Sequence, residues 1–148
     1  MSKQTSRKKS GNKRTNIIPT SYDQTKPIWI FTDLDKSGEF AFDMCKIGND
    51  SYEILDKIIN YSSMTWGEIK RQTHDDNRSK HHYLTYSSLS DAAQRRLKAK
   101  HLEDRSDDIF SFAFTNMLRI IGYTEKEKFY VLWYDPHHEV CPSAKKKN

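Results

Sequence analysis

The stretch from Asp108 to Pro142 constrains the fold most, because its apolar residues recur at every second position in three short runs. The first run, 110–114, alternates phenylalanine with small residues. The second and third runs lie at 118–123 and 129–134. A period of two over successive short segments is typical of β-strands. The stretch therefore predicts an antiparallel meander of three strands.

Shorter strands are predicted before the meander. Strand-like runs lie at 28–31 and 39–45, and the residues between them at 35–38 read Asp-Lys-Ser-Gly, a turn sequence whose Gly permits a positive φ. These two runs predict a first hairpin. A further short strand is predicted at 82–86.

Three helices are predicted between these strands. The first begins at Asp50 or Ser51 and runs to about Tyr61. The sequence Thr-Trp-Gly-Glu at 65–68 fits a capping box and begins a short second helix that ends near residue 71. The third helix follows a Ser N-cap at position 90 and runs to about residue 100. At helical spacing, the first helix is expected to bury an apolar stripe formed by Tyr52, Leu55, Ile58 and Ile59.

These elements predict one α+β domain between two tails. We expect a single domain over 26–143, built as an antiparallel sheet with two to three helices packed on one face. Residues 1–25 are polar and aperiodic, and we expect them to be disordered. Residues 144–148 form a second, Lys-rich tail. The predicted core of the meander consists of Phe110, Phe112, Phe114, Ile120, Val131 and Trp133.

The net charge of +5 belongs to the tails. Residues 1–27 hold seven Lys or Arg side chains and one acid, and three more lysines lie at 145–147, so the centre is net acidic. A basic tail predicts either sequence-independent contact with nucleic acid or a solvated extension. The chain has neither a secretion signal nor a long apolar run, so we expect a cytoplasmic protein that does not contact membranes.

The candidate catalytic residues are two histidine pairs and one arginine. Imidazoles titrate near neutrality and suit general acid–base chemistry, and a guanidinium can stabilise charge on a phosphate. Because neighbouring residues on a strand point to opposite faces, only one histidine of each pair can easily face a shared site. No metal-binding spacing is present, so we expect no metal or other cofactor. The candidates are His81, His82, Arg119, His137 and His138.

A basic stretch of the central part is the candidate RNA-binding surface. The segment 70–105 holds nine Lys or Arg side chains against five acids. Such a stretch is typical either of phosphate contacts or of a solvated helix face. The candidate RNA-binding residues are Lys70, Arg71, Lys80, Arg95, Arg96 and Lys98.

Two resemblances bear on function. The order of helices followed by a three-strand sheet, with Arg119 on the middle strand and His137-His138 after the last, resembles the C-terminal sheet of RelE/ParE-like toxins of bacterial toxin–antitoxin modules. That resemblance implies a metal-independent mRNA endonuclease that acts on RNA or the ribosome and is neutralised by an antitoxin protein. Residues 60–145 also resemble a widespread group of small bacterial proteins of no assigned function. The runs that carry this second resemblance are 65–69, 81–82, 110–112, 132–136 and 138–143.

Three classes of function stay open on the sequence. The first is the RelE-like endoribonuclease. The second is a non-catalytic module that binds nucleic acid or a protein partner. The third is a metal-dependent enzyme that uses the histidine pairs.

Overall fold

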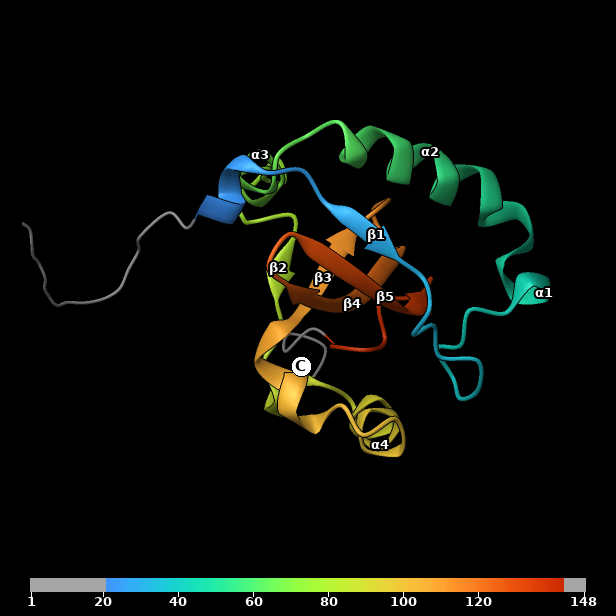
Figure 1. Ribbon diagram of the computed structural model, residues 1–148. Coiled ribbons are helices and arrows are strands. Elements are labelled where there is room, and N and C mark those ends of the chain that lie inside the picture. Colours follow the sequence, from blue (N-terminus) through green and yellow to red (C-terminus); the bar gives the residue numbers. More distant parts are fainter. Residues whose placement is uncertain (1–20, 143–148) are drawn as a thin grey trace, which may run out of the picture.

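Five strands form one mixed sheet at the centre of the molecule (Figure 1). The computed structural model describes residues 21–142. The strand order is β1-β5-β4-β3-β2, in which β1 runs parallel to β5 and the other neighbours are antiparallel. The predicted meander is confirmed as β3, β4 and β5. The strands are β1 (Ile28–Ile30), β2 (His82–Tyr83), β3 (Ile109–Ala113), β4 (Arg119–Glu125) and β5 (Lys128–Asp135).

Helices cover both faces of this sheet, so the α+β class is confirmed, but the prediction of helices on one face is wrong. Helices α1 (Met44–Ile47), α2 (Ser51–Ser62) and α3 (Trp66–Lys70) share an apolar cluster on one face, which we call the α2 face. Helix α4 (Asp91–Ala99) packs on the opposite face, the α4 face. The reason is that the central strands are apolar on both sides, as sheets covered on both faces require.

Strand β5 carries a bulge that changes which face its side chains take. Ile121 of β4 pairs with Trp133 and the next residue, Gly122, pairs with Val131, so Leu132 is an extra residue in β5. As a result Leu132 and Trp133 both join the cluster of the α4 face, whereas Val131 belongs to the α2 face. All six predicted core residues of the meander are buried, but Trp133 lies on the other face from the rest.

The predicted hairpin at 28–45 is wrong. Only β1 joins the sheet, and it pairs with β5 rather than with residues 39–45. The chain then leaves the sheet as a loop that is held by backbone bonds, from the amide of Asp35 to Leu132 O (3.0 Å) and from the amide of Phe42 to Asp35 O (3.0 Å). The second run ends in the short helix α1, whose N-cap Asp43 accepts a hydrogen bond from the amide of Cys45 (2.9 Å).

Helix α2 is confirmed, but it is rotated relative to the predicted stripe. Ile54 and Tyr61 are buried against the sheet, and Ile58 packs partly against the same cluster. Three of the four residues of the predicted apolar stripe are exposed to solvent instead: Tyr52, Leu55 and Ile59.

The predicted caps of α3 and α4 are confirmed, whereas Asp50 precedes α2 without a side-chain capping bond. Thr65 and Glu68 form the reciprocal capping box of α3, with Oγ1 of Thr65 accepting from the amide of Glu68 (3.2 Å) and Oε1 of Glu68 accepting from the amide of Thr65 (2.9 Å). Ser90 caps α4 by accepting from the amide of Ala93 (3.2 Å). These short-range signals were readable because both partners lie within one turn of each other in sequence.

The folded part begins earlier than predicted. Residues 21–24 form a short 3₁₀ helix, and Thr25 O accepts from the amide of Trp66 (2.8 Å). The carboxylate of Asp23 also pairs with Nζ of Lys70 (3.1 Å). Residues 21–25 therefore belong to the domain, whereas the rest of the predicted tails, 1–20 and 143–148, lies outside the described residues. Within 21–142, no helix is long and apolar enough to cross a membrane.

A buried ion pair fastens the loop after β1 to both α4 and β5. The carboxylate of Asp35, only 1% exposed, accepts from Nε (2.9 Å) and Nη2 (2.8 Å) of Arg96 and from the indole of Trp133 (3.0 Å). Gly38 (φ 90°) crosses Arg96 so closely that an added Cβ would lie 2.7 Å from its Cδ. Burial by itself would raise the pKa of Asp35, but its hydrogen bonds from Arg96 and Trp133 outweigh it and hold the pKa below the ordinary value of 3.8.

We predict that Asp35→Asn lowers the free energy of unfolding by about 3 kcal/mol near neutral pH, because Arg96 then lies against a site without its anion. Since the folded-state pKa of Asp35 is lowered, this stabilisation is complete above the ordinary pKa and is lost as pH falls through the lowered one. Denaturant unfolding of both proteins across acid pH should show their difference shrinking. Asp76→Asn, which removes an exposed pair with Arg78, is the control and should change stability little. A pH-independent difference would contradict the account.

Candidate functional site

Three of the five predicted catalytic residues converge on the α4 face. His82 from β2, Arg119 from the start of β4 and His138 after β5 line one small cavity of about 20 Å³. Asp135 and Ser111 line the same cavity. In the sheet, Ser111 of β3 lies opposite His82, and Asp135 lies opposite Arg119. Antiparallel pairing thus gathers residues that are far apart in the sequence.

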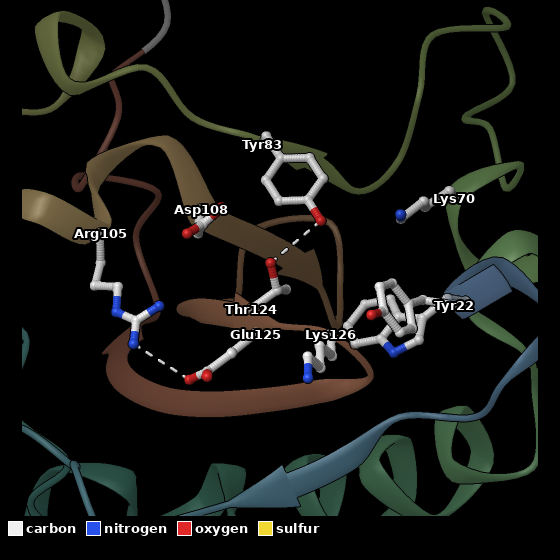
Figure 2. Close-up of a pocket in the computed structure, with 9 residues that line it drawn as sticks. Tyr22, Lys70, Tyr83, Arg105, Asp108, Thr124, Glu125 and Lys126 are labelled. Atoms are coloured by element: carbon white, nitrogen blue, oxygen red, sulfur yellow. Dashed lines mark hydrogen bonds and ion pairs between the residues drawn. The ribbon is translucent and has the colours of Figure 1, made fainter. Parts of the chain in front are cut away.

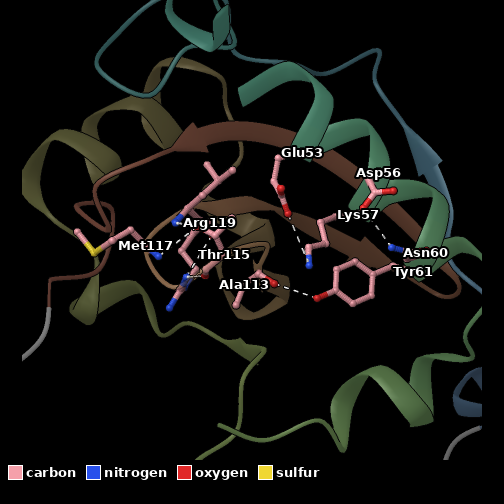
Figure 3. A network of polar contacts seen from close by, with 10 residues as sticks. Glu53, Asp56, Lys57, Asn60, Tyr61, Ala113, Thr115, Met117 and Arg119 are labelled. Atoms are coloured by element: carbon pink, nitrogen blue, oxygen red, sulfur yellow. Dashed lines mark hydrogen bonds and ion pairs between the residues drawn. The ribbon is translucent and has the colours of Figure 1, made fainter. Parts of the chain in front are cut away.

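Arg119 is the buried cation of this cluster. The residue is 7% exposed, and its Nη1 donates to Thr115 O (2.8 Å) and Leu118 O (3.1 Å), which fixes the guanidinium against the β3–β4 turn (Figure 3). Within the described residues, both hydrogen bonds of the guanidinium start from this one nitrogen. Burial lowers the pKa of Arg119, and the nearby charge of Asp135 opposes that effect. Arginine nevertheless stays protonated, so the site holds a fixed positive charge.

Asp135 positions the chain that carries His138. Its carboxylate is 1% exposed and accepts from the backbone amides of Glu139 (2.8 Å) and Val140 (2.9 Å). The turn that this bonding closes contains His138 in a left-handed conformation (φ 61°). Such a conformation is uncommon outside glycine and persists where the surroundings hold it. Asp135 therefore places the imidazole of His138 beside Arg119.

His82 is the solvent-reaching imidazole of the cluster. It lies on the edge strand β2 and is exposed. Desolvation by the neighbouring protein, and then the positive charges of Arg119 and His138, lower the pKa of His82 below its ordinary value of 6.5. The imidazole is therefore neutral at physiological pH and able to accept a proton.

His81 lies on the other face of the sheet from His82, and both of its ring nitrogens form hydrogen bonds there. Its ring is 2% exposed and lies against Tyr61, with ring centroids 5.1 Å apart. Nδ1 accepts from the amide of Ala113 (3.0 Å), so Nε2 carries the proton and donates to Oε1 of Gln72 (2.7 Å). Burial, together with nearby positive charges, lowers the pKa of His81 to about 3. This histidine is neutral, fully bonded and structural, so we leave it out of the catalytic set.

Tyr61 links α2 to the same end of the sheet. Its hydroxyl donates to Ala113 O (2.9 Å), as Figure 3 shows. Ala113 thus receives Tyr61 on its carbonyl and His81 on its amide. These two bonds hold the end of β3 beside the turn that Arg119 fixes.

A larger cavity of about 510 Å³ adjoins the cluster and shares Arg119. One wall is the loop 73–80, which is closed by a bridge between Thr73 and Ser79 and by the bond from the amide of His74 to Arg78 O (2.8 Å). Lys80 and Asn116 also line this cavity. Its size is in the range of ligand-binding sites. Arg119 is therefore common to the cluster and to a cavity large enough to receive a substrate.

The remaining predicted site residues are spread over the molecule. His137 is exposed and lines a different cavity with Glu39 and Lys46. Arg96 is engaged by Asp35, which gives it a structural role. The other RNA-binding candidates do not share one surface: Lys80 lines the 510 Å³ cavity, Lys70 a separate cavity beside α3, Arg95 and Lys98 a shallow one on α4, and Arg71 is exposed at the end of α3.

Within residues 21–142, no group of three or more His, Cys, Asp or Glu side chains is arranged to hold a metal ion. Asp135 of the cluster is not among the predicted catalytic residues. The sequence signal for its role is Asp-Pro at the end of the last strand, since a carboxylate there commonly accepts from amides of the following turn.

A model of the family described as uncharacterised protein UU032 matches residues 41–148. The match agrees with the resemblance of residues 60–145 to a group of proteins of no assigned function. It includes β2 to β5 and therefore the whole cluster, whereas β1 and Asp35 precede it. No curated protein and no solved structure matches the chain.

We predict that the positive charge of Arg119 contributes to the lowered pKa of His82. In Arg119→Met, the pKa of His82 should rise toward its ordinary value because one of the charges that lowers it is gone. Arg119→Lys keeps the charge and should leave the titration of His82 close to wild type. Histidine-selective NMR titration measures this directly, with His101, which lines neither cavity, as internal reference. An unchanged His82 titration in Arg119→Met would show that the two side chains are not coupled.

Proposed function

The chain belongs to the family of the uncharacterised protein UU032, and from the geometry of its site we propose that it is a metal-independent endoribonuclease. The observation that carries this proposal is the convergence of His82, Arg119 and His138 at one small cavity. Two imidazoles beside a buried guanidinium provide the groups that cleavage of an RNA phosphodiester requires.

Each residue has a distinct role in the proposed reaction. The neutral imidazole of His82 takes the proton of a ribose 2′-hydroxyl, and the 2′-oxygen attacks the adjacent phosphorus. Arg119 stabilises the negative charge that develops on the non-bridging oxygens. His138 protonates the departing 5′-oxygen as its bond to phosphorus breaks. The products are a 2′,3′-cyclic phosphate and a free 5′-hydroxyl.

Asp135 and Ser111 act on this reaction indirectly. Asp135 holds the turn that carries His138, through its bonds to the amides of Glu139 and Val140. Its negative charge also lies opposite Arg119 across the strand pair. We assign Asp135 as a positioning residue, because both of its carboxylate oxygens are already bonded to the backbone.

The 510 Å³ cavity is the proposed place of the substrate strand. Arg119 lines both that cavity and the cluster, so a phosphate bound in the larger cavity would lie beside Arg119. Lys80 and Asn116 offer further polar contacts along its wall. Single-stranded RNA exposes its bases to contacts in such a cavity, so a single strand is the favoured form of the substrate.

The resemblance to RelE/ParE-like toxins supports a narrower proposal. We propose that the nuclease acts as the toxin of a toxin–antitoxin module, on messenger RNA that is free or bound to the ribosome. An antitoxin protein would then be its partner. What supports this is the shared order of elements, with Arg119 at the start of β4 and His138 just after β5.

We predict that the full-length protein cleaves single-stranded RNA in the presence of a metal chelator. His82→Gln and His138→Gln should each lower the cleavage rate by about 10²–10⁴-fold, because each removes one proton transfer. Arg119→Met should lower it by about 10²–10³-fold. Cleavage rates are read from a labelled RNA at saturating protein, after circular dichroism has shown that each variant is folded.

His137→Gln is the matched control, since His137 neighbours His138 in sequence but lines another cavity. Its cleavage rate should stay close to that of the wild type. Binding of RNA without cleavage by the wild type would favour a non-catalytic binding module instead. Cleavage that disappears with the chelator would favour a metal-dependent enzyme.

A further inference from the structure

A second cavity lies on the other side of the edge strand β2. It has a volume of about 340 Å³ and is lined by Tyr22, Lys70, Tyr83 and Arg105, among others. Tyr83 directly follows His82 in β2, so the two side chains leave the strand toward opposite faces. His82 faces the proposed catalytic cluster, whereas Tyr83 packs against Phe110 of the α2 face, with ring centroids 4.9 Å apart. Adjacent residues of β2 therefore line the two cavities, on opposite faces of the sheet edge.

Aromatic side chains form part of the wall of this cavity. Tyr22 and Tyr83 are 38% and 43% exposed, so both rings are partly open to solvent. Figure 2 shows Tyr83 bonded to Thr124 (3.3 Å between the two hydroxyl oxygens) on one side of the cavity and Tyr22 on another. The hydroxyl groups add hydrogen-bonding partners to the two ring surfaces.

Three cations surround the same space. Nζ of Lys70 lies 5.6 Å from the ring centroid of Tyr83 and is held by Asp23 (3.1 Å). Arg105 is held by Glu125 (3.2 Å), as Figure 2 shows. Its guanidinium also lies 5.3 Å from the ring centroid of Tyr123. Lys126 adds a third charge from the β4–β5 turn, where its φ is 59°. Asp108 and Glu125 line the cavity as well, so it places three cations and two carboxylates beside two exposed aromatic rings.

We propose that this cavity binds one nucleotide of the same single-stranded RNA that the catalytic cluster cleaves. A base stacks on the Tyr22 ring, and a neighbouring phosphate lies near the ammonium groups of Lys70 and Lys126. Aromatic rings combined with lysine and arginine side chains are the usual way in which proteins hold single-stranded RNA. This inference rests on the proposed function, because it places the strand across the edge of β2 between the two sites.

The test uses the full-length protein and a fluorescein-labelled 2′-O-methyl oligoribonucleotide, which has no free 2′-hydroxyl and cannot be cleaved by the proposed reaction. Tyr22→Ala should weaken binding on the order of 10-fold through lost stacking. Lys70→Met should also weaken binding and flatten its dependence on salt, because one phosphate contact is gone. Tyr22→Phe keeps the ring and should bind as the wild type does.

The chain offers matched controls on α2. Tyr52 is an exposed tyrosine, and Lys57 is a lysine about as exposed as Lys70 that likewise pairs with an acid, Glu53. Neither residue lines the cavity, so Tyr52→Ala and Lys57→Met should bind as the wild type does. Equal thermal melting temperatures of all variants would show that the effects are not caused by unfolding.

The outcomes separate this inference from the proposed function. If Tyr22→Ala and Lys70→Met bind as tightly as the wild type, or if the wild type does not bind the oligonucleotide, the cavity is not an RNA subsite. If these variants lose affinity while the wild type cleaves no RNA, the subsite stands and the nuclease proposal fails. If the wild type cleaves, the same variants should raise KM and leave kcat unchanged, since the catalytic cluster is intact.

Discussion

The extra residue Leu132 in β5 determines on which face of the sheet the following side chains of that strand lie. Without it, Trp133 and Asp135 would follow Val131 onto the α2 face. With it, both residues lie on the α4 face, where Trp133 meets Asp35 and Asp135 meets Arg119. The neighbouring strand accommodates the bulge with Gly122, where a Cβ would lie only 2.1 Å from the carbonyl oxygen of Tyr130. One inserted residue thus supports both the anchoring of the loop after β1 and the assembly of the candidate site.

The sequence was sufficient for the parts of this fold that depend on short-range patterns. The meander, the capping box at Thr65 and the N-cap at Ser90 follow from periodicity and from caps within one turn. The bulge was not visible, because an apolar run such as Val-Leu-Trp reads equally well as regular alternation on a strand buried on both faces. The prediction that helices cover one face of the sheet failed because the alternation did not reveal that these strands are apolar on both faces.

Three of the five predicted catalytic residues lie in the candidate site: His82, Arg119 and His138. Alternation along a strand implies that one histidine of a pair is turned away, and His81 and His82 do lie on opposite sides of β2. Which histidine faces the site depends on register, and register is set by pairing with β3. The cavity of Tyr22 and Tyr83 depends on contacts between the first described residues, α3 and the β4–β5 turn, which no local pattern could reveal.

In the proposed reaction, His82, Arg119 and His138 cleave RNA through attack by the 2′-hydroxyl. The end groups of the cleavage products reveal the route, because the attacking atom determines them. Mass spectrometry of a defined RNA after incubation with the full-length protein should find a 2′,3′-cyclic phosphate on one product and a 5′-hydroxyl on the other. A 5′-phosphate and a 3′-hydroxyl would mean that water attacks the phosphorus instead, which would contradict the roles assigned to the two histidines.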